Sequence, residues 1–295
     1  MELVATLVSD PAAPAVDGPA VVRAREALPA AAVDVLAPGV AADLAFAEDA
    51  APGAVEARLR DALAGLPVDV FVQRPGARRK RLLLADMDST LIGQECIDEL
   101  AAELGIKDRI AAITERAMQG EIAFEPALRE RVALLAGLDA GVVGKVWRER
   151  IRLTPGARTL VATMRAAGAY TAVVSGGFTA FTEKVSAALG FDEHRANVLE
   201  IRDGLLAGTV TEPILGRDAK RQRLLDLARE HGLALAETLA VGDGANDLAM
   251  IREAGLGVAF RAKPAVAAEA DARVEHGDLT ALLYFQGFRR QDLAG

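Results

Sequence analysis

The sequence predicts an α/β protein in which a doubly wound parallel sheet carries a helical cap and follows a small α+β domain. From residue 82 onward, short apolar runs alternate with amphipathic segments, as in a parallel sheet that is buried on both faces. Between the first two of these runs lies a helical excursion that is too long for a single crossover helix. With 295 residues, the chain has room for about two domains.

Residues 1–76 form the predicted first domain. Six segments with strand or helix patterning follow one another along it, in the order strand, helix, two strands, helix, strand: 4–9, 20–28, two pieces of 33–46 on either side of Pro38-Gly39, 54–63 and 68–73. This is a ferredoxin-like order, and it resembles the small amino-acid-binding domains called ACT domains. A docking or dimerisation module without a ligand, which would form a homodimer through this domain, fits the same order. Both interpretations stay open.

Residues 77–295 form the predicted second domain, which begins after a linker that Pro75 and Gly76 punctuate. We interpret the basic run 78–81 as a solvated linker segment before a buried strand. Three apolar runs then mark strands of a Rossmann-like sheet: 82–85, 170–174 and 238–241. A polar cluster follows each strand in turn: 86–90, 175–179 and 242–247. Because the carboxyl ends of parallel strands meet at one edge, these clusters are expected to line one crevice.

The excursion between the first two strands, at about 94–152, is predicted to be a cap. It contains four segments of helical spacing: 95–104, 107–118, 126–136 and 140–151. A helical insertion beside an active-site crevice is typical of a cap that opens and closes. Farther along, Asp203-Gly204 lies between two alternating runs and predicts a hairpin turn.

Composition excludes several classes of function. Lys and Arg number 34 against 42 Asp and Glu, so the net charge of -8 disfavours nucleic-acid binding. No window approaches the ~20 apolar residues that a membrane helix needs, so no membrane partner is expected. A single cysteine, Cys96, excludes an internal disulfide and fits a reducing compartment. The first residues lack the pattern of a signal peptide, so we expect a cytoplasmic protein.

Asp86 and Asp88 are the candidate catalytic pair. They come directly after the first predicted strand of the sheet. An ionised carboxylate that attacks phosphorus forms an acyl phosphate, which divides a difficult displacement into two easier ones. A second carboxyl group can protonate the departing alkoxide and later deprotonate the incoming water. The alternative is that these residues only cap a helix.

The other two polar clusters favour phosphate chemistry. A carboxylate that faces a phosphate dianion needs a cation between them, and Mg²⁺ is the usual one. Asp243, on a glycine-flanked loop, is the candidate additional ligand. Ser175 and the N–H group of Gly176 lie where a helix starts and can hold phosphate oxygens. Lys220 is the candidate cation that completes this phosphate site.

These motifs, in this order and over about residues 80–285, resemble those of the haloacid dehalogenase-like phosphatases. The motifs are Asp86-Met87-Asp88-Ser89-Thr90, Ser175-Gly176-Gly177, Lys220 and Gly242-Asp243-Gly244-Ala245-Asn246-Asp247. A second set resembles the phosphoserine phosphatases within that superfamily: Glu95, Thr114-Glu115-Arg116-Ala117-Met118, Gly120-Glu121, Phe124, Arg131 and Asp278-Leu279-Thr280-Ala281-Leu282-Leu283-Tyr284.

The resemblance implies a role for each matching residue. Asp86 would be the nucleophile and Asp88 the acid/base. Mg²⁺ would be held by Asp86, the backbone carbonyl of Asp88, and Asp243. Ser175, Gly176 and Lys220 would bind the phosphate. Asn246 would close on the substrate side, and Asp247 would support the metal site or Lys220.

Glu95 and Arg131 suit a zwitterionic substrate, because a guanidinium forks onto a carboxylate and a carboxylate accepts from an ammonium group. The resemblance therefore implies Mg²⁺-dependent hydrolysis of O-phospho-L-serine to L-serine and phosphate through an aspartyl phosphate, the last step of serine biosynthesis. Two alternatives stay open. One is a phosphatase or phosphotransferase that acts on another small phosphomonoester, and the other is a non-catalytic phosphoaspartate receiver or amino-acid sensor.

Overall fold

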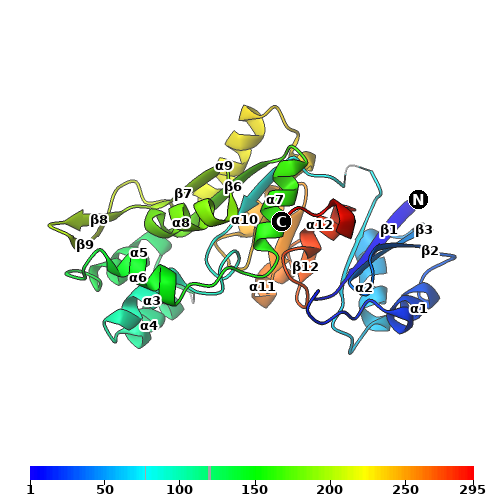
Figure 1. Ribbon diagram of the computed structural model, residues 1–295, viewed down its shortest axis with the longest axis horizontal. Coiled ribbons are helices and arrows are strands. Elements are labelled where there is room, and N and C mark those ends of the chain that lie inside the picture. The colour runs from blue at the N-terminus through cyan, green and yellow to red at the C-terminus, as the bar shows by residue number, and fades with distance from the viewer. Residues whose placement is uncertain (77, 119–120) are drawn as a thin grey trace.

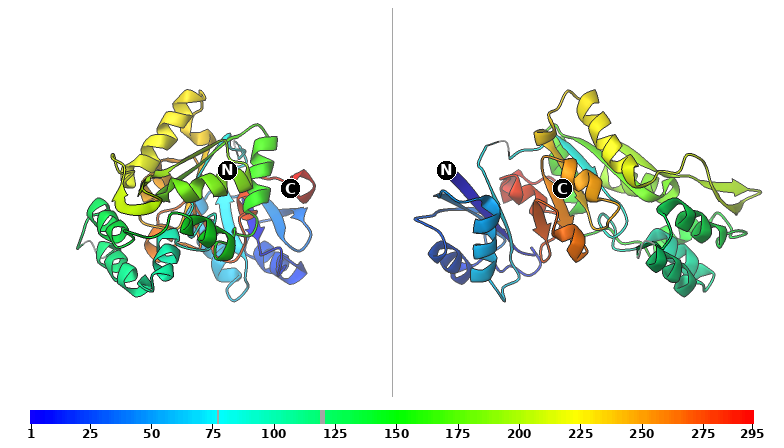
Figure 2. Two further views of the ribbon diagram at one scale, coloured as in Figure 1. Left: turned by 60° about the vertical axis from the view of Figure 1, so that its left-hand side comes forward. Right: turned by 180° about the vertical axis from the view of Figure 1, so that it is seen from behind.

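The computed structural model describes residues 1–76, 78–118 and 121–295. Three parts follow one another along the molecule (Figure 1). The N-terminal sheet and the cap helices lie at opposite ends of a central sheet, and the views in Figure 2 agree on this arrangement. Within the described ranges, no helix combines the length and the apolar character that a membrane span requires.

The N-terminal part is a four-stranded antiparallel sheet with two helices. Its elements are β1 (Glu2–Val8), α1 (Gly18–Glu26), β2 (Ala32–Ala37), β3 (Ala41–Ala47), α2 (Pro52–Ala62) and β4 (Asp69–Gln73). The strand order is β2-β3-β1-β4, which is the predicted ferredoxin-like order. Ala20 and Ala24 of α1 and Val55 and Leu59 of α2 are buried in one core that the two helices share with the sheet.

The central part is a six-stranded parallel sheet. Its strands are β5 (Leu82–Ala85), β6 (Tyr170–Phe178), β7 (Glu193–Asn197), β10 (Thr238–Gly242), β11 (Gly257–Phe260) and β12 (Ala272–Val274), in the order β12-β11-β10-β5-β6-β7. All five neighbouring pairs are parallel. The predicted fold class is therefore confirmed.

Helices cover both faces of this sheet. Successive residues of a strand point to opposite faces, and in β5 the residues on both faces are apolar and buried. The helices that flank the sheet are α7 (Ala157–Ala166), α8 (Thr179–Leu189), α9 (Arg217–Glu230), α10 (Leu248–Glu253), α11 (Pro264–Ala267) and α12 (Ala281–Phe285). Leu82 and Leu84 pack in one core with α9 and α10, whereas Leu83 and Ala85 pack in another with α7, α8 and α12. The chain thus forms a doubly wound layer structure.

The predicted cap region folds into α3 (Cys96–Glu103), α4 (Lys107–Met118), α5 (Phe124–Ala133) and α6 (Val142–Glu149). A hairpin of β8 (Leu199–Arg202) and β9 (Leu205–Val210) turns at Asp203-Gly204, as predicted, with both residues at positive φ. This hairpin packs against the cap, where the Leu206 N–H donates to the Leu138 carbonyl over 2.8 Å. No local sequence pattern indicates this contact.

The basic run 78–81 differs from the expectation at Arg78. Its side chain is only 13% exposed and forms a 2.7 Å ion pair with Asp43 of β3. It also donates to Thr6 of β1 and to the backbone carbonyl of Phe285 in α12. The interpretation as a solvated linker is therefore wrong for this residue. Arg78 thus bonds to both the N-terminal part and the central part of the molecule. The buried carboxylate of Asp43 lies opposite it only in the folded structure.

Candidate active site

The three predicted polar clusters meet at the carboxyl ends of neighbouring strands. β5 lies between β10 and β6, so Asp86 follows the central strand of the three. Ser175 lies within β6, and Asp243 follows β10. The chain leaves β5 toward β6 on one side and reaches β10 on the other only later, so this is a topological switch point. The structure thus brings the clusters together where ligands bind in such sheets.

Asp86 is buried, with 4% of its surface exposed. Its Oδ1 accepts from the Met87 N–H over 2.7 Å and lies 2.7 Å from Lys220 Nζ. Burial, with the nearby charge of Asp247, raises the pKa of Asp86 well above its ordinary value, and Lys220 opposes this shift. An ionised Asp86 therefore depends on positive charge nearby.

Lys220, on α9, is equally buried and lies between two carboxylates. Its Nζ is 2.7 Å from Asp86 and 2.5 Å from Asp247. Burial alone would lower the pKa of Lys220, but the charges of Asp247 and Asp86 outweigh it, and the pKa is raised. The lysine is therefore a fixed positive charge beside the candidate nucleophile.

Asp86, Asp243 and Asp247 each place one carboxylate oxygen within 4.8 Å of the others. Burial raises the pKa of Asp243 to about 6, and Asp247 adds to the shift. Both oxygens of Asp247 are engaged, Oδ1 by Lys220 and Oδ2 by the N–H groups of Asp243 and Gly244. Asp247 thus holds the loop and the lysine. The raised pKa values of Asp86 and Asp243 indicate that these crowded carboxylates would be stabilised by a cation, and their hard oxygen atoms fit a divalent ion such as Mg²⁺.

Asp88 is held from two sides. Its Oδ1 accepts from the Cys96 N–H at the start of α3 over 2.9 Å, and its Oδ2 accepts from Ser175 Oγ over 3.2 Å. Burial raises the pKa of Asp88, and the hydrogen bonds from Cys96 oppose the shift. A Cβ atom at Gly177 would lie 2.7 Å from Asp88 Oδ2, so glycine is required there for this approach. Asp88 is thus positioned, and favoured in its protonated form.

Ser175 and Gly176 lie in the last residues of β6, so α8 begins three residues after Gly176, at Thr179, and not directly at these residues as expected. Ser175 Oγ accepts from the Gly177 N–H over 2.9 Å. The Gly176 carbonyl accepts from Asn197 Nδ2, also over 2.9 Å. The ring of Phe124, on the cap, lies 3.1 Å from the point where a Cβ of Gly176 would be. The cap therefore reaches directly over this end of β6.

Glu95 immediately precedes α3 and points back to the β5 loop. Its Oε1 accepts from Ser89 Oγ over 2.6 Å. Burial raises the pKa of Glu95 to about 7, and the charge of Asp88 adds to the shift. Ser89 has a positive φ of 56°, a conformation that few residues other than glycine adopt. The turn after β5 thus presents Ser89 to Glu95.

Arg131, on α5, faces the same acidic side chains. Its Nη1 donates to Thr114 Oγ1 over 3.2 Å. Burial lowers the pKa of Arg131, and the charges of Glu95, Asp98 and Asp88 oppose the shift. Arg131 of α5 and Glu95, which precedes α3, are therefore close enough for their charges to interact, and the charge of Asp88 acts on both.

Asn246 is a predicted site residue on the loop that follows β10. It lies in the loop of Asp243 and Asp247, and a Cβ at Gly244 would be 2.3 Å from its Oδ1. The side chain is thus folded over its own loop. Two members of the cap motif, Gly120 and the side chain of Met118, lie outside the described residues.

Three residues that contact the site were not predicted as site residues from the sequence: Ser89, Thr114 and Asn197. Ser89 and Thr114 belong to quoted motifs, and each holds a charged residue of the cap through its hydroxyl group. Asn197 ends β7 and lies in no motif. It joins the Gly176 carbonyl to the segment before α9, since its Oδ1 accepts from the Leu215 N–H over 2.7 Å. Only the tertiary structure identifies it.

Comparison with known proteins gives a consistent family. Residues 83–252 match the model of the haloacid dehalogenase-like hydrolases. A phosphoserine phosphatase of Streptomyces coelicolor is 48% identical over 252 residues, which cover 83% of this chain and 61% of the relative. The phosphoserine phosphatase SerB2 of Mycobacterium tuberculosis is covered over 56% of its length. The chain thus spans about three-fifths of the first curated relatives it matches.

Solved structures agree. A haloacid dehalogenase family hydrolase of Salmonella enterica serovar Typhi has a TM-score of 0.86 at 30% identity, with 96% of this chain and 98% of that chain covered. A phosphoserine phosphatase described as a phospho-aspartyl intermediate analogue has a TM-score of 0.66 at 42% identity, with 70% and 99% covered. The chain belongs to the haloacid dehalogenase-like hydrolase family and to its phosphoserine phosphatase branch.

Proposed function

We propose that this chain hydrolyses O-phospho-L-serine to L-serine and phosphate through a phosphoaspartate at Asp86. The observation that carries the proposal is the buried set of Asp86, Lys220 and Asp247 beside Asp88, with Glu95 and Arg131 of the cap next to it. The similarity to a phosphoserine phosphatase described as a phospho-aspartyl intermediate analogue supports the same chemistry.

In the first step, an oxygen of Asp86 attacks phosphorus and the bond from phosphorus to the serine oxygen breaks. Lys220 and the Met87 N–H hold the other oxygen of Asp86 and so fix the direction of attack. Asp88 gives its proton to the departing serine oxygen. Its raised pKa, caused by burial, favours the protonated form that this role requires.

In the second step, water attacks the phosphorus of the phosphoaspartate. Asp88, now ionised, takes the proton of the water, and the bond between phosphorus and Asp86 breaks. Phosphate leaves and the Asp86 carboxylate is restored. Ser175 and the backbone of Gly176 bind phosphate oxygens in both steps, and Lys220 offsets their charge.

Mg²⁺, held by Asp86, Asp243 and the backbone carbonyl of Asp88, would supply the positive charge that lets two anions approach each other. The raised pKa values of Asp86 and Asp243, both caused first by burial, support a cation here. Asp247 completes the arrangement by holding Lys220 and the loop that presents Asp243.

Substrate selection rests on the cap. Arg131 would bind the carboxylate of phosphoserine and Glu95 its ammonium group. Asn246 would close on the same side from the loop after β10. Thr114 accepts from Arg131, and Ser89 donates to Glu95, so each of the two charged side chains is oriented by a hydroxyl group.

Three finer expectations belong to this proposal. Mg²⁺ is the expected ion because the donors are hard oxygens. A cytoplasmic location is supported by a composition with one cysteine. A homodimer through the N-terminal domain stays a prediction that light scattering of the purified protein would test.

The test is phosphate release from L-phosphoserine with and without Mg²⁺, beside p-nitrophenyl phosphate, with Asp86→Asn as control. The proposal expects fast, Mg²⁺-dependent release that favours phosphoserine and is lost in the control. Activity on the generic ester alone would refute the proposed substrate. Stable phosphorylation without turnover would favour a receiver or sensor.

A further inference from the structure

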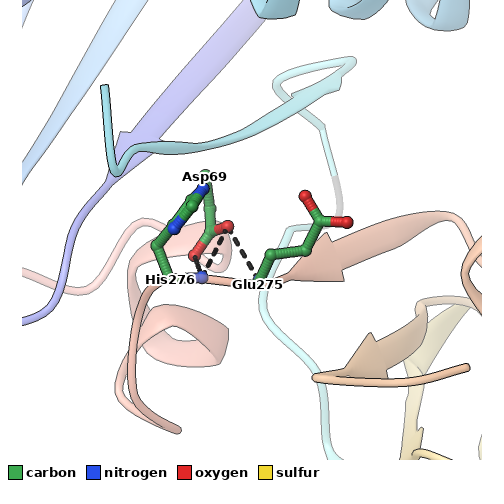
Figure 3. Close-up of side chains that lie close together, drawn as sticks. All are labelled: Asp69, Glu275 and His276. Carbon is green, nitrogen blue, oxygen red and sulfur yellow. Dashed lines mark hydrogen bonds between the residues drawn. The ribbon is translucent and has the colours of Figure 1, made fainter. Parts of the chain in front are cut away.

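Neither the N-terminal domain nor the motif that begins at Asp278 takes part in the proposed chemistry. Asp69, at the start of β4, connects the two. It is completely buried, and both of its oxygens accept backbone N–H groups of the loop that follows β12. Oδ1 accepts from Glu275 over 2.8 Å, and Oδ2 accepts from Gly277 over 2.7 Å. Figure 3 shows Asp69 facing the backbone at Glu275 and His276.

Asp69, Glu275 and His276 also form a group whose spacing would allow a metal ion. The carboxylate is already fully engaged, however, because the His276 N–H donates to both of its oxygens over 3.2 Å. The side chains of Glu275 and His276 are exposed. The group is therefore a structural latch between the N-terminal domain and the loop of residues 275–280.

This loop, which we call the latch loop, packs on the segment that follows the cap. The Leu279 N–H donates to the Pro155 carbonyl over 3.1 Å. A Cβ atom at Gly156 would lie 2.7 Å from the Thr280 nitrogen, and Gly156 has a φ of 79°. Only glycine fits this position without displacing the latch loop.

Pro155 and Gly156 directly follow the return connection of the cap. The two connections between cap and core, residues 91–93 and 152–154, pair with each other. The Gly93 N–H donates to the Arg152 carbonyl over 3.0 Å, and the Thr154 N–H donates to the Leu91 carbonyl over 2.9 Å. We call these two segments the cap hinge, because any movement of the cap relative to the sheet must pass through them.

We propose that the N-terminal domain braces the cap hinge, with Asp69 as a positioning residue that holds the latch loop against Pro155 and Gly156. The contacts run from β4 through the latch loop to Pro155 and Gly156, which continue along the chain into residues 152–154, and hydrogen bonds join these to residues 91–93. Loosening the latch frees the hinge and favours the open cap. The open cap holds the amino-acid part of the substrate less well, while the groups at the strand ends stay in place.

The structural test is hydrogen exchange of the full-length protein carrying Asp69→Asn. Asparagine keeps the shape of the side chain but turns an NH₂ group toward backbone N–H donors. We expect the amides of Gly93 and Thr154 to exchange about tenfold faster than in the wild type. The matched control is Asp34→Asn, which removes a 2.6 Å ion pair between the same two parts of the molecule, with Arg289, away from the hinge. This control leaves both amides unchanged.

Gly156→Ala serves as a second variant, because it disturbs the contact between the latch loop and Gly156 from the side of the central domain. It is expected to accelerate exchange at the same two amides. Acceleration confined to the latch loop in both variants, or equal acceleration in Asp34→Asn, would overturn the proposal.

A second, kinetic experiment depends on the proposed function. Asp69→Asn is expected to raise KM for L-phosphoserine at least about threefold while kcat stays within about twofold, and both constants for p-nitrophenyl phosphate stay unchanged. A fall in kcat for both substrates would contradict a positioning role. If the wild type fails to hydrolyse phosphoserine, the proposed function fails, whereas the exchange experiment still decides the role of Asp69.

Discussion

Replacing Lys220 by methionine tests the electrostatics of the site most sharply. Methionine has a similar length and fills the space, but it removes the charge that lies 2.7 Å from Asp86 and 2.5 Å from Asp247. Two buried carboxylates then face each other without compensation. Removing one partner of a buried ion pair costs about 3–5 kcal/mol, and protonation of Asp86 limits the loss here to about 3 kcal/mol.

For a domain of this size, about 3 kcal/mol corresponds to a decrease in Tm of about 6–12 °C. The decrease depends on pH with a defined sign. Without Lys220, the burial that raises the pKa of Asp86 is unopposed, so the folded state binds a proton more tightly than the unfolded state. Stability is then retained at low pH and lost as the pH rises. The gap to the wild type is smaller at pH 5 than at pH 8.

Thermal unfolding of both proteins at pH 5 and pH 8, with and without Mg²⁺, measures these effects. We expect Mg²⁺ to stabilise the variant more than the wild type, because the bound cation offsets the repulsion between carboxylates that Lys220 no longer neutralises. Lys220→Leu serves as a control for packing. A Tm within about 2 °C of the wild type at pH 8, or a gap that does not change with pH, would refute the reasoning.

Two further predictions concern substrate selection. Arg131→Gln is expected to raise KM for L-phosphoserine about 30- to 100-fold, because it removes a charge-assisted contact with the carboxylate, while p-nitrophenyl phosphate is turned over within about threefold of the wild type; equal losses on both substrates would count against this role. Because burial raises the pKa of Glu95 to about 7, the ratio of kcat/KM for phosphoserine to that for the ester is expected to fall below about pH 7 as Glu95 gains a proton. Glu95→Gln should make this ratio independent of pH, and a ratio that already is so in the wild type would contradict the assignment.

Much of the fold could be predicted because its signals are local. Leu82 to Ala85 form an uninterrupted apolar run, which is typical of a strand buried on both faces. The polar residues that follow each strand then had to meet at one edge, and Asp86, Ser175 and Asp243 do so. The order of segments in the first domain likewise predicted its sheet.

What the sequence could not supply are contacts between distant segments. Arg78 resembled a solvated basic residue, because nothing local shows that Asp43 lies opposite it. The contact of the hairpin with the cap depends on Gly208, where a Cβ would lie 2.8 Å from that of Ala136. Asn197 stands in no motif, although it joins Gly176, near the end of β6, to the segment before α9. Each of these roles depends on tertiary packing.

The most direct test of the central claim is to locate the phosphoryl group on the protein. Asp88→Asn slows the second step, so p-nitrophenyl phosphate labelled in its phosphoryl group should leave the label on the protein after an acid quench. We predict the label in the peptide that contains Asp86, with release by hydroxylamine as expected for an acyl phosphate. Label on any other residue, or rapid phosphoserine hydrolysis by Asp86→Asn, would contradict the account.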